Sequence, residues 1–202
     1  LLPVIFKSFG DFKPGLYVYL TVPFVAIFGL TEFTVRLPSA IAGVFAIWFI
    51  FLIINQFKNS QLGLIAAFLL AINHWHIHFS RCALEANVSL TLTLIGIYFF
   101  LKSLKNSKFL ILSSIFFSLT FLTYQGAKLS TSIALLVLAI TFWKDLKRIL
   151  LARSDLVSSI VVGLVIASPI LLSFISGQTG RLNVFSVFSY PRPHDYLQTF
   201  LD

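Results

Sequence analysis

The chain has 202 residues and a formal net charge of +8, with 58% hydrophobic and 11% charged residues. About a quarter of the residues of a soluble globular protein are charged, and a soluble domain of this length could not bury 23 phenylalanines. The composition therefore indicates an integral membrane protein. The single cysteine, Cys82, excludes an internal disulfide and a multi-cysteine metal site.

Long neutral intervals along the chain predict an all-α fold, a polytopic integral membrane bundle. A membrane-spanning helix needs about 20 mainly apolar residues. After a shorter apolar segment at 14–30, we expect six spans, near residues 37–55, 61–79, 83–101, 109–124, 128–143 and 156–175. These segments form one predicted domain, residues 1–176. Glycine, proline and polar residues then replace aliphatic ones, so residues 177–202 are expected to be an external loop.

The positive charge gathers in short loops and indicates topology, not nucleic-acid binding. Lysines and arginines are concentrated in the loops 102–108 and 144–155. Positively charged loops of membrane proteins usually face the cytoplasm. The connectors 74–82 and 124–128 are therefore expected on the external side.

The segment 14–30 follows a charged pair, Asp11 and Lys13, and its sidedness stays open on physical grounds. If the segment spanned the membrane, Lys13 would be cytoplasmic; if it lay in the interface, Lys13 would be external. Two tyrosines and the internal Pro23 suit an interfacial helix. Asp11 is either a pocket residue or an interfacial one.

The outward connector around residue 80 contains an arginine and a glutamate. Arg81 and Glu85 are four residues apart, so on a continuous helix they would share a face. Glu85 lies at the start of a predicted span, where an ionised carboxylate is costly unless it is paired or faces an aqueous cavity. We interpret Glu85 as functional; the alternative is an ion pair with Arg81 that anchors the helix end.

Three histidines alternate in the same connector. On a helix, His74 and His78 lie on one side, which makes them candidates for a divalent metal site. No HExxH-type spacing accompanies them. The alternative is an interfacial belt shared with Trp75.

Further cations are predicted on the external side. Lys128, close to Tyr124 and Gly126, either holds a phosphate or extends its ammonium to the interface from an apolar helix. Arg36, which precedes a leucine and a proline, either binds an anionic headgroup or lipid phosphate, or anchors its helix.

The stretch DFKPGLYVYLTVPFVAIFGLTEFTVRLPSAIAGVFAIWFIFLI, which begins at Asp11, resembles the opening of GT-C class membrane glycosyltransferases. The closest pattern is that of the RgtA/B/C/D-like and protein O-mannosyltransferase-like (ArnT-like) group: K/H-P-P-L-Y, an aromatic-aliphatic run, F-G, a polar turn and R-L-P-S-A. The positions that match are Lys13, Pro14, Leu16, Tyr17, Phe28, Gly29 and 36–40. Gly15 stands where a second proline is usual. HFSRCALEANVSL and SLTFLTYQGAKLS continue the similarity, which covers roughly residues 9–143.

The resemblance implies an inverting enzyme that moves a sugar from a polyprenyl-phosphate donor to a lipid, glycan or protein acceptor. The reaction would take place on the outer face of a bacterial or archaeal plasma membrane, among membrane lipids. The resemblance makes 14–30 an external juxtamembrane helix, so Lys13 is placed outside.

The resemblance also implies roles for single residues. Lys13 matches the family lysine that holds the donor phosphate, a task that Arg81 could share. Glu85 matches the family's second acidic residue, which orients the acceptor or a metal; no cofactor other than a divalent metal is implied. The family's principal catalytic base, an acidic residue, would precede Leu1, so this chain alone is expected to be inactive.

A polytopic transporter or lipid flippase, without transferase activity, shares the hydrophobicity and the positive loops, and a catalytically inactive membrane scaffold is a third hypothesis. Transporters place polar groups or broken helices near the middle of the membrane. The candidate residues here gather at the external ends of the predicted spans, which favours surface chemistry on a lipid substrate.

Overall fold

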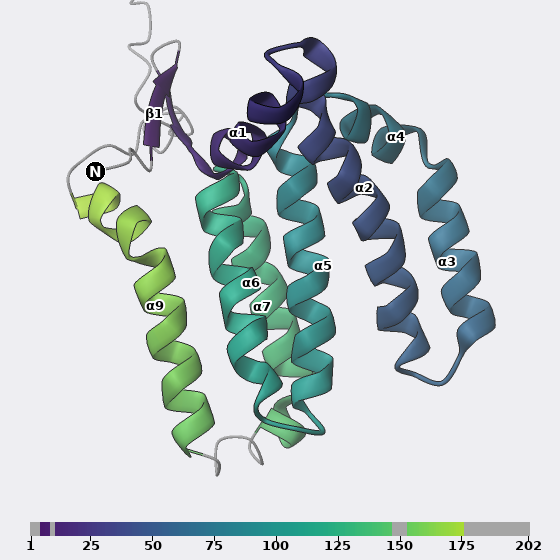
Figure 1. The fold of residues 1–202 in the computed structure, drawn as a ribbon. Coiled ribbons are helices and arrows are strands. Elements are labelled where there is room, and N and C mark those ends of the chain that lie inside the picture. Colours follow the sequence, from purple (N-terminus) through teal and green to yellow (C-terminus); the bar gives the residue numbers. More distant parts are fainter. Residues whose placement is uncertain (1–4, 9–10, 147–152, 176–202) are drawn as a thin grey trace, which may run out of the picture.

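The computed structural model describes residues 5–8, 11–146 and 153–175, which are predominantly helical. Long helices run side by side, while a β-hairpin, α1 and α4 lie across one end of the bundle (Figure 1). We call this end the hairpin end; it comprises residues 5–8, 11–36, 73–85 and 123–128. The opposite end, the lysine end, comprises residues 55–60, 102–109 and 141–146.

The hairpin consists of β1 (Ile5–Ser8) and β2 (Asp11–Pro14), which pair antiparallel with Phe6 opposite Lys13. Sequence analysis predicted no strands, so this hairpin adds a small β element to the expected helical fold. Proline lacks the N–H group that a ladder needs, and Pro14 is the last residue of β2. The hairpin therefore leads directly into the first helix.

The helix α1 (Leu16–Phe28) crosses the hairpin end instead of running parallel to the bundle (Figure 1). Gly15 precedes it, Pro23 lies within it, and it ends at Gly29 with a φ of 77°, which favours glycine. Tyr17 fixes the helix to its neighbour, because its hydroxyl donates to the carbonyl oxygen of Val35 at 2.9 Å. The bounds are close to those predicted for a juxtamembrane helix.

The helices α2 (Glu32–Asn55) and α3 (Ser60–Ile72) form an antiparallel pair. Thr31 caps α2 by accepting from the amide of Thr34 at 3.2 Å, and Asn59 caps α3 by accepting from the amide of Leu62 at 2.9 Å. Lys58, with a φ of 60°, makes the turn between them at the lysine end.

The predicted span near 61–79 is divided into two helices. After α3 the chain turns by 60° into α4 (His74–Arg81). Asn73 has an extended backbone, and its side chain accepts from the amide of His76 at 3.1 Å. This cap begins a new helix that lies across the hairpin end, so the segment predicted as one span is bent within it.

The remaining helices pack as a layered group: α5 (Glu85–Ser103), α6 (Phe109–Thr123), α7 (Ala127–Thr141) and α9 (Arg153–Ile175). The core between α5 and α6 contains Phe100, Leu101 and Phe117. Small residues allow close approach: a Cβ on Gly96 would lie 3.0 Å from the Phe117 ring, and Ser114 donates to the Ser159 carbonyl at 2.6 Å.

Two described helices, α2 and α5, are long and apolar enough to cross a membrane, and α3 with α4 makes a third if the bent pair is one span. The expected six spans are thus not confirmed. The helices α6 and α7 have 15 residues each, or roughly 22 Å at 1.5 Å per residue, against a hydrocarbon core of about 30 Å. The predicted external loop, 177–202, lies outside the described residues.

Candidate active site

Most of the candidate residues from the sequence lie at the hairpin end, on different elements. Lys13 is half-buried on β2, immediately before α1. Phe6 on the facing strand packs near Tyr19 of α1, with ring centroids 6.1 Å apart. The hairpin thus holds Lys13 beside the start of α1. Asp11 begins β2, and its side chain lies outside the described part of the structure.

Tyr17 connects α1 electrostatically to the start of α5. Its pKa is raised from 10.0 to about 12, mainly because the phenol is buried; the backbone of Ser39 lowers it, and the carboxylate of Glu85 raises it further. Tyr17, Ala42 and Val88 form one buried cluster, so α1, α2 and the first turn of α5 converge. Glu85 itself is half-buried, at a helix N-terminus that favours negative charge.

Arg81 and Glu85 do not share a helix face, contrary to the expectation from their spacing. Arg81 ends α4, the chain is extended at Cys82 and Leu84, and Glu85 begins α5. The two side chains form no ion pair in the described structure, so the anchoring pair that sequence analysis considered is wrong. Arg81 is exposed at the end of α4.

Arg36 is paired, but with a residue that the sequence analysis did not consider. Its guanidinium lies 3.1 Å from the carboxylate of Glu32, one turn earlier on α2. Both side chains are largely exposed and line a shallow pocket of about 450 Å³ that also includes Ala83, just before α5. Substrate binding by Arg36 stays a prediction.

The histidines of α4 differ in their surroundings. His74 and His78 are exposed, and no group of three metal-binding side chains occurs among the described residues. His76, which sequence analysis did not select, is buried and its Nε2 lies 3.1 Å from the carbonyl oxygen of Gly43 on α2. A metal site at His74 and His78 therefore has no third ligand in the described structure.

The turn between α6 and α7 brings Tyr124 and Lys128 to the hairpin end. Tyr124 follows α6, and its ring lies so close to Gly126 that a Cβ there would be 2.5 Å from a ring carbon. This contact, and not an unusual φ, makes Gly126 necessary. Lys128 is half-buried in the first turn of α7, and phosphate binding by Lys128 stays a prediction.

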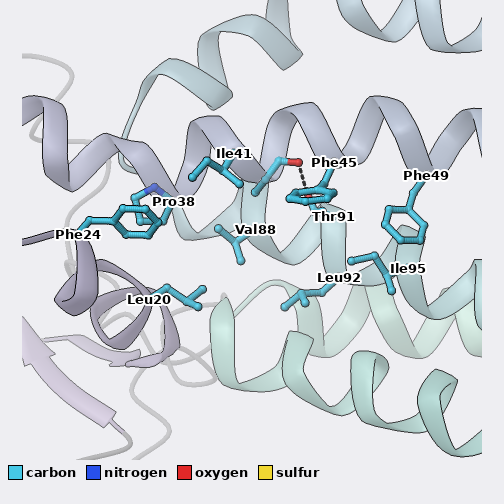
Figure 2. Close-up of a pocket in the computed structure, with 11 residues that line it drawn as sticks. Leu20, Phe24, Pro38, Ile41, Phe45, Phe49, Val88, Thr91, Leu92 and Ile95 are labelled. Atoms are coloured by element: carbon cyan, nitrogen blue, oxygen red, sulfur yellow. Dashed lines mark hydrogen bonds between the residues drawn. The ribbon is translucent and has the colours of Figure 1, made fainter. Parts of the chain in front are cut away.

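An apolar groove of about 310 Å³ runs beneath α1, between α2 and α5 (Figure 2). Leu20 and Phe24 of α1 cover it, and Phe45, Val88 and Leu92 are among its walls. Thr91 is its one hydroxyl-bearing residue, and that hydroxyl donates to the Ala42 carbonyl at 2.8 Å. The groove therefore offers an apolar chain a path along the bundle from the hairpin end.

Most of the described helices are apolar, and two of them are long enough to cross a membrane. The hairpin end combines cations and the carboxylate of Glu85 with the start of the apolar groove. A family model described as dolichyl-phosphate-mannose-protein mannosyltransferase matches residues 13–172. Because this match covers most of the chain, the protein belongs to that family, which consists of GT-C type glycosyltransferases. No curated protein and no solved structure gives a significant match.

Proposed function

We propose that the protein transfers a sugar from a polyprenyl-phosphate-linked donor to a lipid, glycan or protein acceptor on the extracytoplasmic side of the membrane. Family membership supports glycosyl transfer with such a donor. The structural observation that supports the proposal is the groove beneath α1. Its apolar walls suit an isoprenoid lipid, and it starts at the end of the bundle that holds Lys13.

In this proposal, Lys13 holds the donor phosphate. Negative charge develops on that phosphate as the bond to the sugar breaks, and a fixed ammonium stabilises it. Arg81, exposed at the end of α4, is a second cation for the same phosphate. Lys128, Tyr124 and Arg36 are further contacts for the donor or for lipid headgroups.

Glu85 would orient the acceptor, or a metal that binds it. A carboxylate near the acceptor hydroxyl accepts its proton, or positions it for another base, as the new glycosidic bond forms. The half-buried Glu85 is suited to a positioning role, since the helix N-terminus favours its charged form.

Filling the groove tests the proposal. In the full-length protein, Leu92→Trp narrows the groove, whereas Leu64→Trp adds the same side chain to an exposed position on α3 outside it. We expect Leu92→Trp to raise KM at least about tenfold for a long-chain polyprenyl-phosphate donor, and Leu64→Trp to leave it unchanged. An unchanged KM in Leu92→Trp would remove the groove as the site of the donor lipid.

A further inference from the structure

The first turn of α5 is not held by a cap of its own. Leu84 is the residue that precedes α5, and its aliphatic side chain accepts no hydrogen bond from the free amides of that turn. The chain is extended at Cys82 and Leu84, so α4 does not continue into α5. Glu85, the first residue of α5, therefore needs support from elsewhere in the fold to keep a fixed position.

Asn87, two residues after Glu85, supplies this support. It is 2% exposed, and its Nδ2 donates to the carbonyl oxygen of Ser39 on α2 at 2.7 Å. The same Nδ2 lies 3.3 Å from Oγ of Ser39 and 3.4 Å from Oγ of Ser80 on α4. One amide group thus contacts two other helices from the turn that carries Glu85.

The two hydroxyls near this amide are arranged as acceptors. Ser39 Oγ donates to the carbonyl oxygen of Phe79 at 3.0 Å, and Ser80 Oγ donates to that of His76 at 2.7 Å. Each hydroxyl has one proton, so its oxygen is left to accept from Asn87. We call Ser39, Ser80 and Asn87 the Asn87 cluster; it joins α2, the last turn of α4 and the first turn of α5.

Close packing leaves the Asn87 cluster little freedom. A Cβ at Gly43 on α2 would collide with Oγ of Ser80, so α4 approaches α2 where the side chain of α2 is smallest. The carbonyl oxygen of Gly43 also lies 3.1 Å from Nε2 of His76 on α4. The end of α4 is therefore a firm support for the Asn87 amide.

Stability alone does not explain an asparagine at this position. Its Oδ1 is buried and has no hydrogen-bond partner among the described residues. Such an acceptor lowers stability, because it loses its contacts with water and gains none in the fold. A leucine of similar size would remove this acceptor together with the donor. Asn87 thus fits a positioning role better than a purely stabilising one.

We propose that Asn87 is a positioning residue for Glu85. It fixes the first turn of α5 against α2 and the end of α4, and thereby the direction in which the Glu85 carboxylate meets the acceptor. This inference rests on the proposed function, in which Glu85 orients the acceptor. Asn87 does not line the groove beneath α1, so binding of the donor lipid does not depend on it.

Asn87→Leu in the full-length protein in nanodiscs tests this role. The substitution removes the amide and keeps the approximate size of the side chain. We expect kcat for sugar transfer to fall about tenfold and KM for the polyprenyl-phosphate donor to stay within about twofold. The melting temperature should fall no further than in the control Ser113→Ala. An unchanged kcat, or a melting temperature well below that of the control, would overturn the proposal.

Ser39→Ala and Ser113→Ala form a matched pair. Both serines are buried and donate to a carbonyl oxygen of another helix, Ser39 to Phe79 at 3.0 Å and Ser113 to Gly96 at 2.9 Å. Ser113 joins α6 to α5 outside the hairpin end. Ser39→Ala should lower kcat, whereas Ser113→Ala should keep it. This pair decides the matter even if Asn87→Leu does not fold, because equal kcat values would overturn the proposal.

A double variant shows whether Asn87 acts through Glu85. If it does, Asn87→Leu has no further effect once the carboxylate is gone, so Asn87→Leu with Glu85→Gln should transfer sugar at the rate of Glu85→Gln alone. Independent roles would multiply the two losses, and that result would overturn the proposal.

Hydrogen exchange separates this inference from the proposed function. The amides of residues 82–87 should exchange faster in Asn87→Leu than in the unaltered protein, and at the unaltered rate in Ser113→Ala. Unchanged exchange in Asn87→Leu would overturn the positioning role. An unaltered protein that transfers no sugar would instead overturn the proposed function, and faster exchange would still show that Asn87 holds this turn.

Discussion

The hairpin end and the lysine end both carry cations, but the surroundings of those cations differ. At the lysine end the cations lie in short turns or in helix ends beside them. Lys102, in the last turn of α5, has its ammonium 4.8 Å from the centroid of the Tyr98 ring and 5.3 Å from that of Phe109. At the hairpin end Lys13 lies between a strand and a transverse helix that covers an apolar groove. Charge alone therefore does not distinguish topology signals from candidate catalytic groups; the elements around it do.

Buried polar contacts sharpen this difference. The transverse helices of the hairpin end are joined to α2 by Tyr17, which donates to Val35, and by Ser39, which donates to the carbonyl oxygen of Phe79 at 3.0 Å. Such contacts hold α1 and α4 in fixed positions over the long helices. A site that must align a lipid phosphate and an acceptor requires this kind of fixed support.

The largest effect among the variants of this comparison is expected for Glu85. Glu85→Gln keeps the size of the side chain and removes its charge, and Glu32→Gln makes the same change in the first turn of α2 at the same end. We expect kcat to fall about 100-fold in Glu85→Gln and to stay unchanged in Glu32→Gln. Initial rates with the full-length protein measure both, and equal rates would remove Glu85 from the site.

Tyr17 predicts an alkaline loss of stability that originates at the hairpin end. Its folded pKa of about 12 exceeds the ordinary value of 10.0, so the phenol stabilises the fold fully below about pH 10 and this contribution is lost as the pH rises to about 12. The loss corresponds to about 2–3 kcal/mol. Thermal unfolding from pH 9 to 12 should show a steep decline in stability. Tyr17→Phe should reduce this decline, whereas Tyr98→Phe, on α5 near the lysine end, should retain it; the same decline in Tyr17→Phe would contradict the assignment.

The smallest effect is expected for the ion pair of Arg36 with Glu32. Both side chains are largely exposed, at 54% and 86%, and are spaced by one helical turn. Such pairs contribute at most about 0.5 kcal/mol, and less at high salt. Arg36→Ala should therefore leave the melting temperature nearly unchanged. If the same variant raises KM for the donor, Arg36 has a role in binding. A large loss of stability would show that the pair is structural.

Part of this fold was predictable from local sequence. The apolar intervals predicted most of the helices, and a proline-glycine pair after Lys13 marked the start of α1. The break at Asn73 carried a local signal that was missed, since asparagine is a strong helix cap. The hairpin was missed because its strands are only four residues long and depend on pairing with each other.

The site was less predictable because its contacts join distant residues. Lys13 was selected by family resemblance, and Glu85 by the cost of a carboxylate at the start of a predicted span as well as by resemblance. Their positions at the hairpin end follow from the packing of β2, α1 and α5. The spacing of Arg81 and Glu85 predicted a shared face on a continuous helix, but three residues, two of them extended, separate their helices. His76 contacts a carbonyl 33 residues away, and Asn87 contacts Ser39 across 48 residues. Helical periodicity carries no information on such pairs.

The most direct test of the account is a comparison of one lysine at each end in a transfer assay. The full-length protein in nanodiscs receives a radiolabelled polyprenyl-phosphate sugar donor, and release of the sugar is measured for Lys13→Ala and for Lys105→Ala, an exposed residue of the lysine end. The account predicts that Lys13→Ala loses at least about 100-fold in kcat/KM for the donor while Lys105→Ala stays within about twofold. Equal turnover in the two variants would contradict the hairpin end as the place where the lipid-linked donor reacts.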